Sequence, residues 1–152
     1  MMISDLTAVH GTNGKILAVD FGDTRTGLAV SDPSRLLASG IGYVSPGGIE
    51  KTADAVADIA KEQRVVAVVV GLPVNMDGSE GSRAQRCRKF ASMLSDRLEL
   101  PVAMFDERMT TMTASRYLNE TNTRGKKRKS VIDTLSAQII LQNCLDRLRY
   151  LS

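Results

Sequence analysis

Aromatic side chains are scarce in this chain of 152 residues, and tryptophan is absent. Phe, Tyr and Trp together make up 4% of the residues, so the core has to be built from Val, Leu, Ile, Ala and Met. A protein that binds single strands mainly by stacking bases needs a set of exposed rings, and this composition argues against that class. The 43% hydrophobic and 24% charged residues are otherwise typical of a globular domain.

Cysteine and long apolar runs are scarce as well. Cys87 and Cys144 lie far apart and neither has the spacing of a metal site, which favours two buried, reduced thiols over a disulfide or a zinc site. The longest apolar run, Val65 to Leu72, is far shorter than the roughly 20 residues that span a bilayer. The first residues lack the basic segment and apolar stretch of an export signal. We therefore expect a cytoplasmic location and no membrane partner.

Positive charge is concentrated in one segment, although the formal net charge is only +3. Lys126, Lys127, Arg128 and Lys129 form an unbroken basic run just after Arg124. Such a run suits a polyanion, and it is also compatible with a solvated loop.

The hydrophobic pattern changes part-way along the chain. Three strand patterns separated by short turns come first, which favours antiparallel pairing, and helices then alternate with strands. The expected strands are Lys15–Asp20, Gly27–Ser31, Leu37–Val44, Val65–Val70 and Val102–Phe105. The expected helices are Ile49–Ala60, Glu80–Leu98, Thr111–Asn119 and Ser130–Tyr150, with a loop over Glu120–Lys129. The pattern predicts a loose segment over residues 1–14 and one α/β domain over 15–152, with a five-stranded mixed sheet and helices on both faces.

Carboxylates stand at the ends of two predicted strands: Asp20 at the first, and Asp106 and Glu107 at the last. Ligands collect at the carboxyl ends of strands in such sheets. Converging carboxylates repel one another unless a divalent cation is bound, and Mg²⁺ prefers oxygen ligands. Neighbouring strand residues point to opposite faces, so only one of Asp106 and Glu107 should reach the site. Taken singly, Asp20 could instead cap a turn, and Asp133 could be a favourable acid in the first turn of a helix.

Two further features fit a phosphate ligand without requiring one. Arg108 could clamp a phosphate or could pair with its acidic neighbours. Residues 71–73 and 76–80 form a loop into the second helix, and helix N-termini can hold phosphates.

Four segments of the chain, taken in order, resemble the YqgF family, also called RuvX. They are Asp20-Phe21-Gly22 with Arg25, Gly27, Ala29 and Ser31-Asp32; Gly71-Leu72-Pro73 with Met76-Asp77-Gly78-Ser79-Glu80; Asp106-Glu107-Arg108 with Thr110-Thr111; and the basic run followed by Asp133 and the helix Ser136-Ala137-Gln138-Ile139-Ile140-Leu141. The resemblance runs from about Lys15 to Leu145 at family-like spacing. It departs from the family near Asp133, where Ile132 and Thr134-Leu135-Ser136 replace the more frequent Val and paired alanines, while Asp133 itself is retained.

The resemblance implies an RNase H-like fold related to RuvC-type Holliday junction resolvases, and a hydrolase acting on phosphodiester bonds with Mg²⁺ or Mn²⁺. It implies a role in maturing the 5′ end of 16S rRNA during ribosome biogenesis. By motif position, Asp20, Glu107 and Asp133 are the expected catalytic, metal-binding acids. The expected substrate-binding residues are Arg25, Arg108, Lys126, Lys127, Arg128 and Lys129.

Several readings of the sequence stay open. The leading one is an endonuclease on structured RNA, acting as a monomer or weak homodimer. A resolvase acting on branched DNA would use the same metal chemistry, and a non-catalytic RNA-binding assembly factor would need only the basic run. An ATPase domain of the actin or sugar-kinase type also opens with an acid and a glycine, but it requires a second domain that 152 residues do not supply.

Overall fold

The computed structural model describes residues 5–108 and 125–151, and within the last helix it describes side chains from Thr134 onward. The elements in chain order are α1 (Leu6–His10), β1 (Ile16–Asp20), β2 (Thr26–Ser31), β3 (Ala38–Val44), α2 (Ile49–Glu62), β4 (Ala67–Leu72), α3 (Ser82–Arg97), β5 (Val102–Asp106) and α5 (Gly125–Tyr150).

The five strands form one mixed sheet in the order β3-β2-β1-β4-β5. β1 pairs antiparallel with β2, and β2 pairs antiparallel with β3, with a bulge opposite Leu28 and Ala29. β4 and β5 add in parallel on the other side of β1. The predicted mixed sheet is therefore confirmed, and β1 lies at its centre because it joins the antiparallel half to the parallel half.

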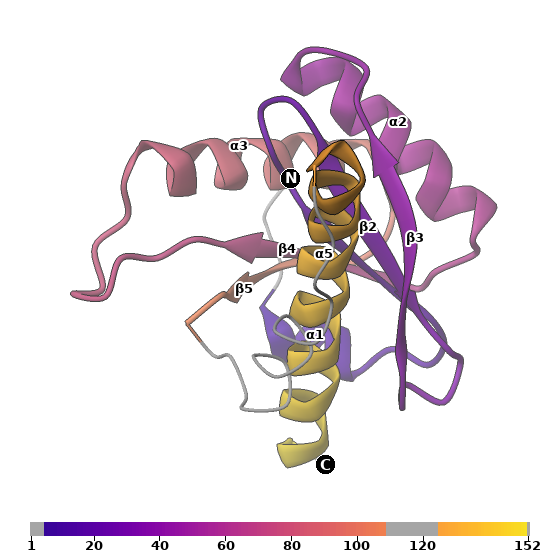
Figure 1. Cartoon of the computed structure of the whole chain (residues 1–152). Helices are drawn as coiled ribbons and strands as arrows, with labels where there is room; N and C mark the ends of the chain where they lie inside the picture. Colours follow the sequence, from indigo (N-terminus) through magenta and orange to yellow (C-terminus); the bar gives the residue numbers. More distant parts are fainter. Residues whose placement is uncertain (1–4, 109–124, 152) are drawn as a thin grey trace.

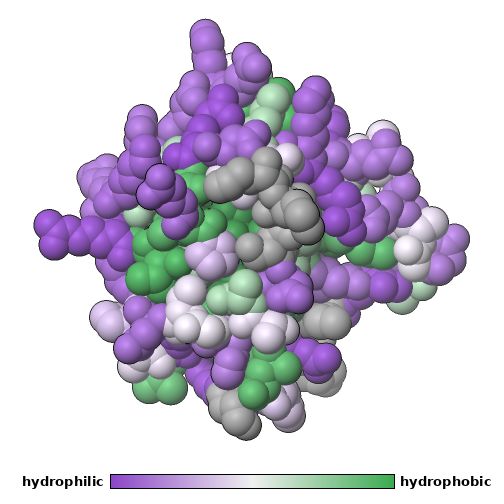
Figure 2. Space-filling view, turned by 180° about the vertical axis from the view of Figure 1, so that it is seen from behind, coloured by the Kyte–Doolittle hydropathy of each residue, from purple (hydrophilic) through white to green (hydrophobic). Residues whose placement is uncertain are grey.

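Alternate residues of the central strands enter two separate cores, so the sheet is covered on both faces. Leu17 and Val19 pack toward α2 and α3, whereas Ile16 and Ala18 pack toward α1 and α5. Figure 1 shows this arrangement, with α5 crossing one face of the sheet and α2 and α3 on the other. Seen from behind, long hydrophilic side chains dominate the rim of the molecule, and a smaller hydrophobic area lies nearer the middle (Figure 2).

Two glycines allow α5 to lie close against the sheet. A Cβ on Gly40 of β3 would stand 2.3 Å from Thr134 Cγ2, and a Cβ on Gly71 of β4 would stand 2.7 Å from Ile140 Cδ1. Side chains at these positions would push the helix away. The glycines thus fix the path of α5 over the face of the sheet that carries Ala18.

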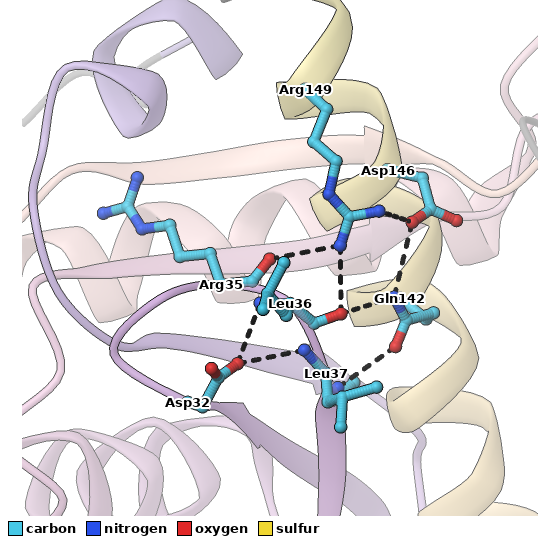
Figure 3. A network of polar contacts seen from close by, with 8 residues as sticks. Asp32, Arg35, Leu36, Leu37, Gln142, Asp146 and Arg149 are labelled. Carbon is cyan, nitrogen blue, oxygen red and sulfur yellow. Dashed lines mark hydrogen bonds and ion pairs between the residues drawn. The ribbon is translucent and has the colours of Figure 1, made fainter.

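Hydrogen bonds hold the C-terminal half of α5 to the turn between β2 and β3 (Figure 3). Gln142 accepts a bond from the Ala38 backbone N–H at 3.1 Å and donates one to the Leu36 carbonyl at 3.2 Å. Arg149 donates to the same carbonyl at 3.0 Å and pairs with Asp146. The turn itself is closed by Asp32, which accepts the N–H groups of Leu36 and Leu37 at 2.9 Å each. These bonds set the axial position of α5.

Apart from shifts of one or two residues at the ends of elements, the structure differs from the sequence-based expectation in two places. Leu6–His10 form a helix in the segment expected to be loose, because Asp5 caps it at the N-terminus and Val9 is fully buried in the α5-side core. The prediction of a loop over Glu120–Lys129 is wrong for residues 125–129, because these residues form the start of α5. Lys and Arg are good helix formers, so a basic run readily extends a helix that is already anchored. The helix expected at Thr111–Asn119 lies outside the described residues, and the division of the chain at residue 15 stays a prediction.

Both cysteines are free and buried, as expected. Burial raises the pKa of the Cys87 thiol to about 11 and that of Cys144 to about 12, which keeps both thiols protonated. None of the helices described is long and apolar enough to cross a membrane.

Candidate active site

The last residue of β1, Asp20, lies on the α5 face between two residues that have no side chain. It follows Ala18 by two positions, and Ala18 belongs to the α5-side core. Its antiparallel partner is Gly27 of β2. On the other side the pairing of Val19 with Val70 brings Gly71 of β4 beside it. The Asp20 carboxylate therefore stands beside a floor made by the backbone of these two glycines, at the carboxyl edge of the central strand, and Glu107 and Ile140 lie above Gly71.

Glu107 reaches back over this floor from the end of β5. Its backbone N–H donates to the Leu72 carbonyl at 3.1 Å, which continues the ladder one residue past the strand. Its Oε2 lies 3.1 Å from the position of a Cβ on Gly71, so the absence of that atom makes room for the carboxylate. Burial and then the charge of Asp20 raise the pKa of Glu107 to about 7, although the Arg83 guanidinium acts in the opposite direction. Asp20 and Glu107 thus act on one another across Gly71.

Asp106, the neighbour of Glu107, has a different role. Arg108 pairs with its carboxylate at 2.7 Å and also donates its backbone N–H to it at 2.9 Å. This pairing holds the pKa of Asp106 below its usual value. Of the two readings of Arg108, the structure has the pairing with its acidic neighbour, and its binding of substrate stays a prediction.

The N-terminal half of α3 carries two arginines that interact with this region, Arg86 with the segment after β1 and Arg83 with Glu107, and sequence reasoning missed both. Arg86 pairs with Asp23 at 2.8 Å and lies over the Phe21 ring, with Cζ 5.8 Å from the ring centroid. Arg83, one turn earlier, lowers the pKa of Glu107. Their three-residue spacing near the start of a predicted helix puts them on one helix face, and this was the available signal.

The loop before α3 is closed by its own side chains. Gly78 has φ +89°, the left-handed backbone that its tight turn requires. Asp77 accepts the backbone N–H and the hydroxyl of Ser79 at 2.9 and 2.6 Å, and Glu80 pairs with Arg88 at 2.6 Å. Because α3 begins only at Ser82, Ser79 and Glu80 lie before the helix rather than in its first turn.

Arg25, just before β2, lies beside the sheet on the side of β3. Its Cζ is 5.1 Å from the centroid of the Tyr43 ring, a cation–π contact. Tyr43 pairs with Gly27, the residue that also pairs with Asp20. Tyr43 and Asp20 therefore belong to one row across the sheet, and Arg25 contacts the Tyr43 end of that row.

The remaining expected site residues are not described at the level of side chains. Asp133 and the run Lys126–Lys129 belong to the first turns of α5, and their side chains lie outside the described residues. Among the side chains that the structure does describe, no group of three or more His, Cys, Asp and Glu could hold a metal. The described pair still fits a divalent cation, because two carboxylate groups that repel one another supply the oxygen ligands that Mg²⁺ or Mn²⁺ takes.

Comparison with known proteins agrees with this geometry. The profile of a family described as "RuvX: Holliday junction resolvase" matches residues 14–147. The chain belongs to the RuvX family. A relative from Cereibacter sphaeroides is 44% identical over 149 residues, covering 98% of this chain and 93% of the relative. One from Ruminiclostridium cellulolyticum is 38% identical over 135 residues, covering 88% and 95%. Both carry the name "Putative pre-16S rRNA nuclease".

A solved structure allows the fold of this chain to be compared as well. Thermus thermophilus RuvC, in complex with a Holliday junction substrate, matches with a TM-score of 0.58 at 14% identity, covering 90% of this chain and 96% of RuvC. The mixed sheet and its helices thus have the RNase H-like fold of RuvC-like resolvases, as the sequence resemblance implied.

Proposed function

We propose that this chain is a metal-dependent endonuclease that processes the 5′ end of precursor 16S rRNA in the cytoplasm. The observation that carries the proposal is the convergence of Asp20 and Glu107 on one face of the sheet, across Gly71. The names of its relatives support the substrate, because chains about 40% identical over nearly their whole length are called pre-16S rRNA nucleases.

Asp20 and Glu107, with Asp133 as the third acid by family position, are the proposed ligands of Mg²⁺ or Mn²⁺. A bound divalent cation would supply charge stabilisation for the phosphodiester and lower the pKa of a nucleophilic water. The residues of the chain admit and bind the nucleic acid. Gly27 puts no side chain on the β2 side of Asp20, which is where a phosphate would approach the carboxylates, and the basic residues at the start of α5 attract the nucleic acid. Arg25 and Arg108 are the further proposed substrate contacts.

Removing the metal tests the proposal directly. A transcript that carries the 5′ leader of 16S rRNA should be cut at a defined position in Mg²⁺ or Mn²⁺. Cleavage should stop in EDTA and return when the metal is restored, because carboxylates alone cannot offset the charge of the reacting phosphate. Gel analysis of the products measures it. Cleavage that continues unchanged in EDTA would contradict metal dependence, and binding without any cleavage would support the assembly-factor alternative.

A resolvase acting on branched DNA is the second candidate, favoured by the description of the matching family. The same gel assay with a four-way DNA junction at equal concentration separates the two. We expect faster cleavage of the rRNA precursor by the chain, acting as a monomer or weak homodimer. Symmetric nicking of the junction with an uncut precursor would favour the resolvase.

The basic run gives a prediction about binding. Changing Lys126 and Lys127 to Ala should weaken binding and flatten its salt dependence, because each lost phosphate contact removes about 0.7 to 0.9 from the slope of log K against log salt concentration. Titrations at several salt concentrations by fluorescence anisotropy measure that slope. The matched control is Lys51→Ala with Lys61→Ala on α2, which removes the same charge on the other side of the sheet. An equal slope for both double variants would show that the run does not contact the substrate.

A further inference from the structure

Tyr43 is an exposed aromatic residue on the edge strand, in a chain with only three tyrosines and three phenylalanines. Its side chain is 41% exposed, whereas Phe21, Phe90 and Phe105 are at most 4% exposed. β3 pairs only with β2 and is thus the edge of the described sheet (Figure 1). A tyrosine at an edge could simply contribute β propensity. The position of Tyr43 relative to Asp20 indicates a role in binding the substrate.

The strand register places Tyr43 in line with Asp20. Tyr43 pairs with Gly27, and Gly27 pairs with Asp20. Paired residues share a face, so Tyr43 and Asp20 both point to the α5 side, and Val44, the next residue, packs into the core on the other side. Two strand spacings make the separation about 10 Å. Because Gly27 has no side chain, nothing from β2 stands between the ring and the carboxylate.

Arg25 adds positive charge to the ring. Its guanidinium group lies 5.1 Å from the ring centroid. A planar cation against an aromatic ring is a surface on which a nucleobase can stack, and the charge of the cation also favours the adjoining phosphate. The ring and the Asp20 carboxylate therefore lie in one row across the sheet, with the Arg25 guanidinium against the ring, so a strand that crosses this row meets all three.

We infer that Tyr43, with Arg25, is a stacking platform for one unpaired nucleobase within about three nucleotides of the scissile phosphate, since stacked nucleotides rise about 3.4 Å each. This inference rests on the proposed function and narrows its substrate. The nucleic acid crosses the sheet edge toward β3 with a base free of its partner, so the site takes a single-stranded segment that flanks structured RNA. One ring at the site is compatible with the low aromatic content, because charge still supplies most of the binding.

Fluorescence of 2-aminopurine tests the stacking without requiring cleavage. The probe is a single-stranded RNA of the 16S leader sequence, with 2-aminopurine in turn at each of the three positions on either side of the cut. Wild-type protein in Ca²⁺ should quench the fluorescence at one or two neighbouring positions. Tyr43→Phe should keep the quenching, and Tyr43→Leu, which retains an apolar residue on the strand, should abolish it. Annealing the probe to its complement should also abolish it.

Binding measurements give the size of the effect. Loss of one stacked base weakens binding by between about fivefold and 150-fold, so Tyr43→Leu should raise the Kd for the single strand within that range. An abasic nucleotide at the quenched position should weaken wild-type binding equally and leave Tyr43→Leu unaffected. The control is Tyr150→Leu, which changes an 83% exposed tyrosine at the far end of α5.

The outcomes separate the inference from the proposed function. If wild-type protein cuts the precursor but quenching and Kd do not differ between wild type and Tyr43→Leu, the platform is refuted and the nuclease stands. Quenching that is strongest on the annealed probe also refutes the platform. If no metal-dependent cleavage occurs while quenching still depends on Tyr43, the nuclease proposal fails, and Tyr43 remains a base-stacking site with no scissile phosphate beside it.

Discussion

Asp20→Asn should reduce metal-dependent cleavage at least about 100-fold while nucleic-acid binding persists. Asparagine keeps the shape of the side chain and removes the charge that would hold the cation. A metal ion contributes several kcal/mol to stabilising charge on a reacting phosphate, and each 1.36 kcal/mol changes the rate tenfold. Initial rates at saturating substrate, measured over a range of Mg²⁺ concentrations, give the effect on turnover and on the metal requirement. Anisotropy with the same transcript gives the binding.

The control for this substitution lies three residues away. Asp23→Asn makes the same chemical change at a side chain that is 72% exposed and pairs with Arg86. It should leave the rate within about twofold, because surface ion pairs contribute little. Asp20→Asn should not destabilise the fold, since it removes a charge that raises the pKa of Glu107. Cleavage by Asp20→Asn at the wild-type rate would refute the nuclease mechanism proposed for this site.

The position of Asp20 could be predicted from the sequence because strand periodicity is local. An apolar run that ends on an acid places that acid at a sheet edge, and the alternation of side chains implied that only one of Asp106 and Glu107 could join it. In the structure Glu107 lies over Gly71 and acts on Asp20, whereas Asp106 binds Arg108. Local pattern was thus sufficient for the antiparallel half of the sheet and for carboxylates at two strand ends, whereas the choice of Glu107 over Asp106 came from the family resemblance.

What the sequence could not supply is the relation between elements that pack together. Gly27 and Gly71 make the floor beside Asp20 only once the pairing register is known, and the same register brings Tyr43 into line. The beginning of α5 was missed because charge suggested a loop, whereas the helix is anchored from its far end by Gln142 and Arg149. The strand register and the start of α5 depend on contacts between residues far apart in the sequence, and such contacts produce no periodic pattern in it.

Glu107→Gln should stabilise the metal-free protein at pH 8 by about 2 kcal/mol and should have little effect near pH 4. Glu107 has a pKa of about 7 in the fold against 4.5 as the ordinary value, because burial and the charge of Asp20 disfavour its ionised form. Below pH 4.5 Glu107 is protonated in both the folded and the unfolded state, so its ionisation does not lower the free energy of unfolding. Between pH 4.5 and 7 only the folded state keeps the proton, so the free energy of unfolding falls as pH rises. Above pH 7 it stays lowered by the full amount. The pKa rise sets an upper limit of roughly 3 kcal/mol, which partial exposure reduces.

Urea unfolding in EDTA at pH 4, 6 and 8 measures this dependence for wild type and Glu107→Gln. Glu99→Gln makes the same change at an exposed position before β5 and reports the effect of the substitution alone. Mg²⁺ at pH 8 should stabilise the wild type more than Glu107→Gln, because a cation held by ionised Glu107 and Asp20 offsets their repulsion and binds only the folded state. Equal stabilisation of both proteins by Mg²⁺ would remove Glu107 from the proposed ligands. A wild-type stability that does not fall between pH 4 and 8 relative to Glu107→Gln would show that the carboxylate is neither buried nor held close to Asp20. The pH dependence measures how strongly the fold disfavours ionised Glu107 beside Asp20. The Mg²⁺ dependence measures whether the same two acids bind a cation.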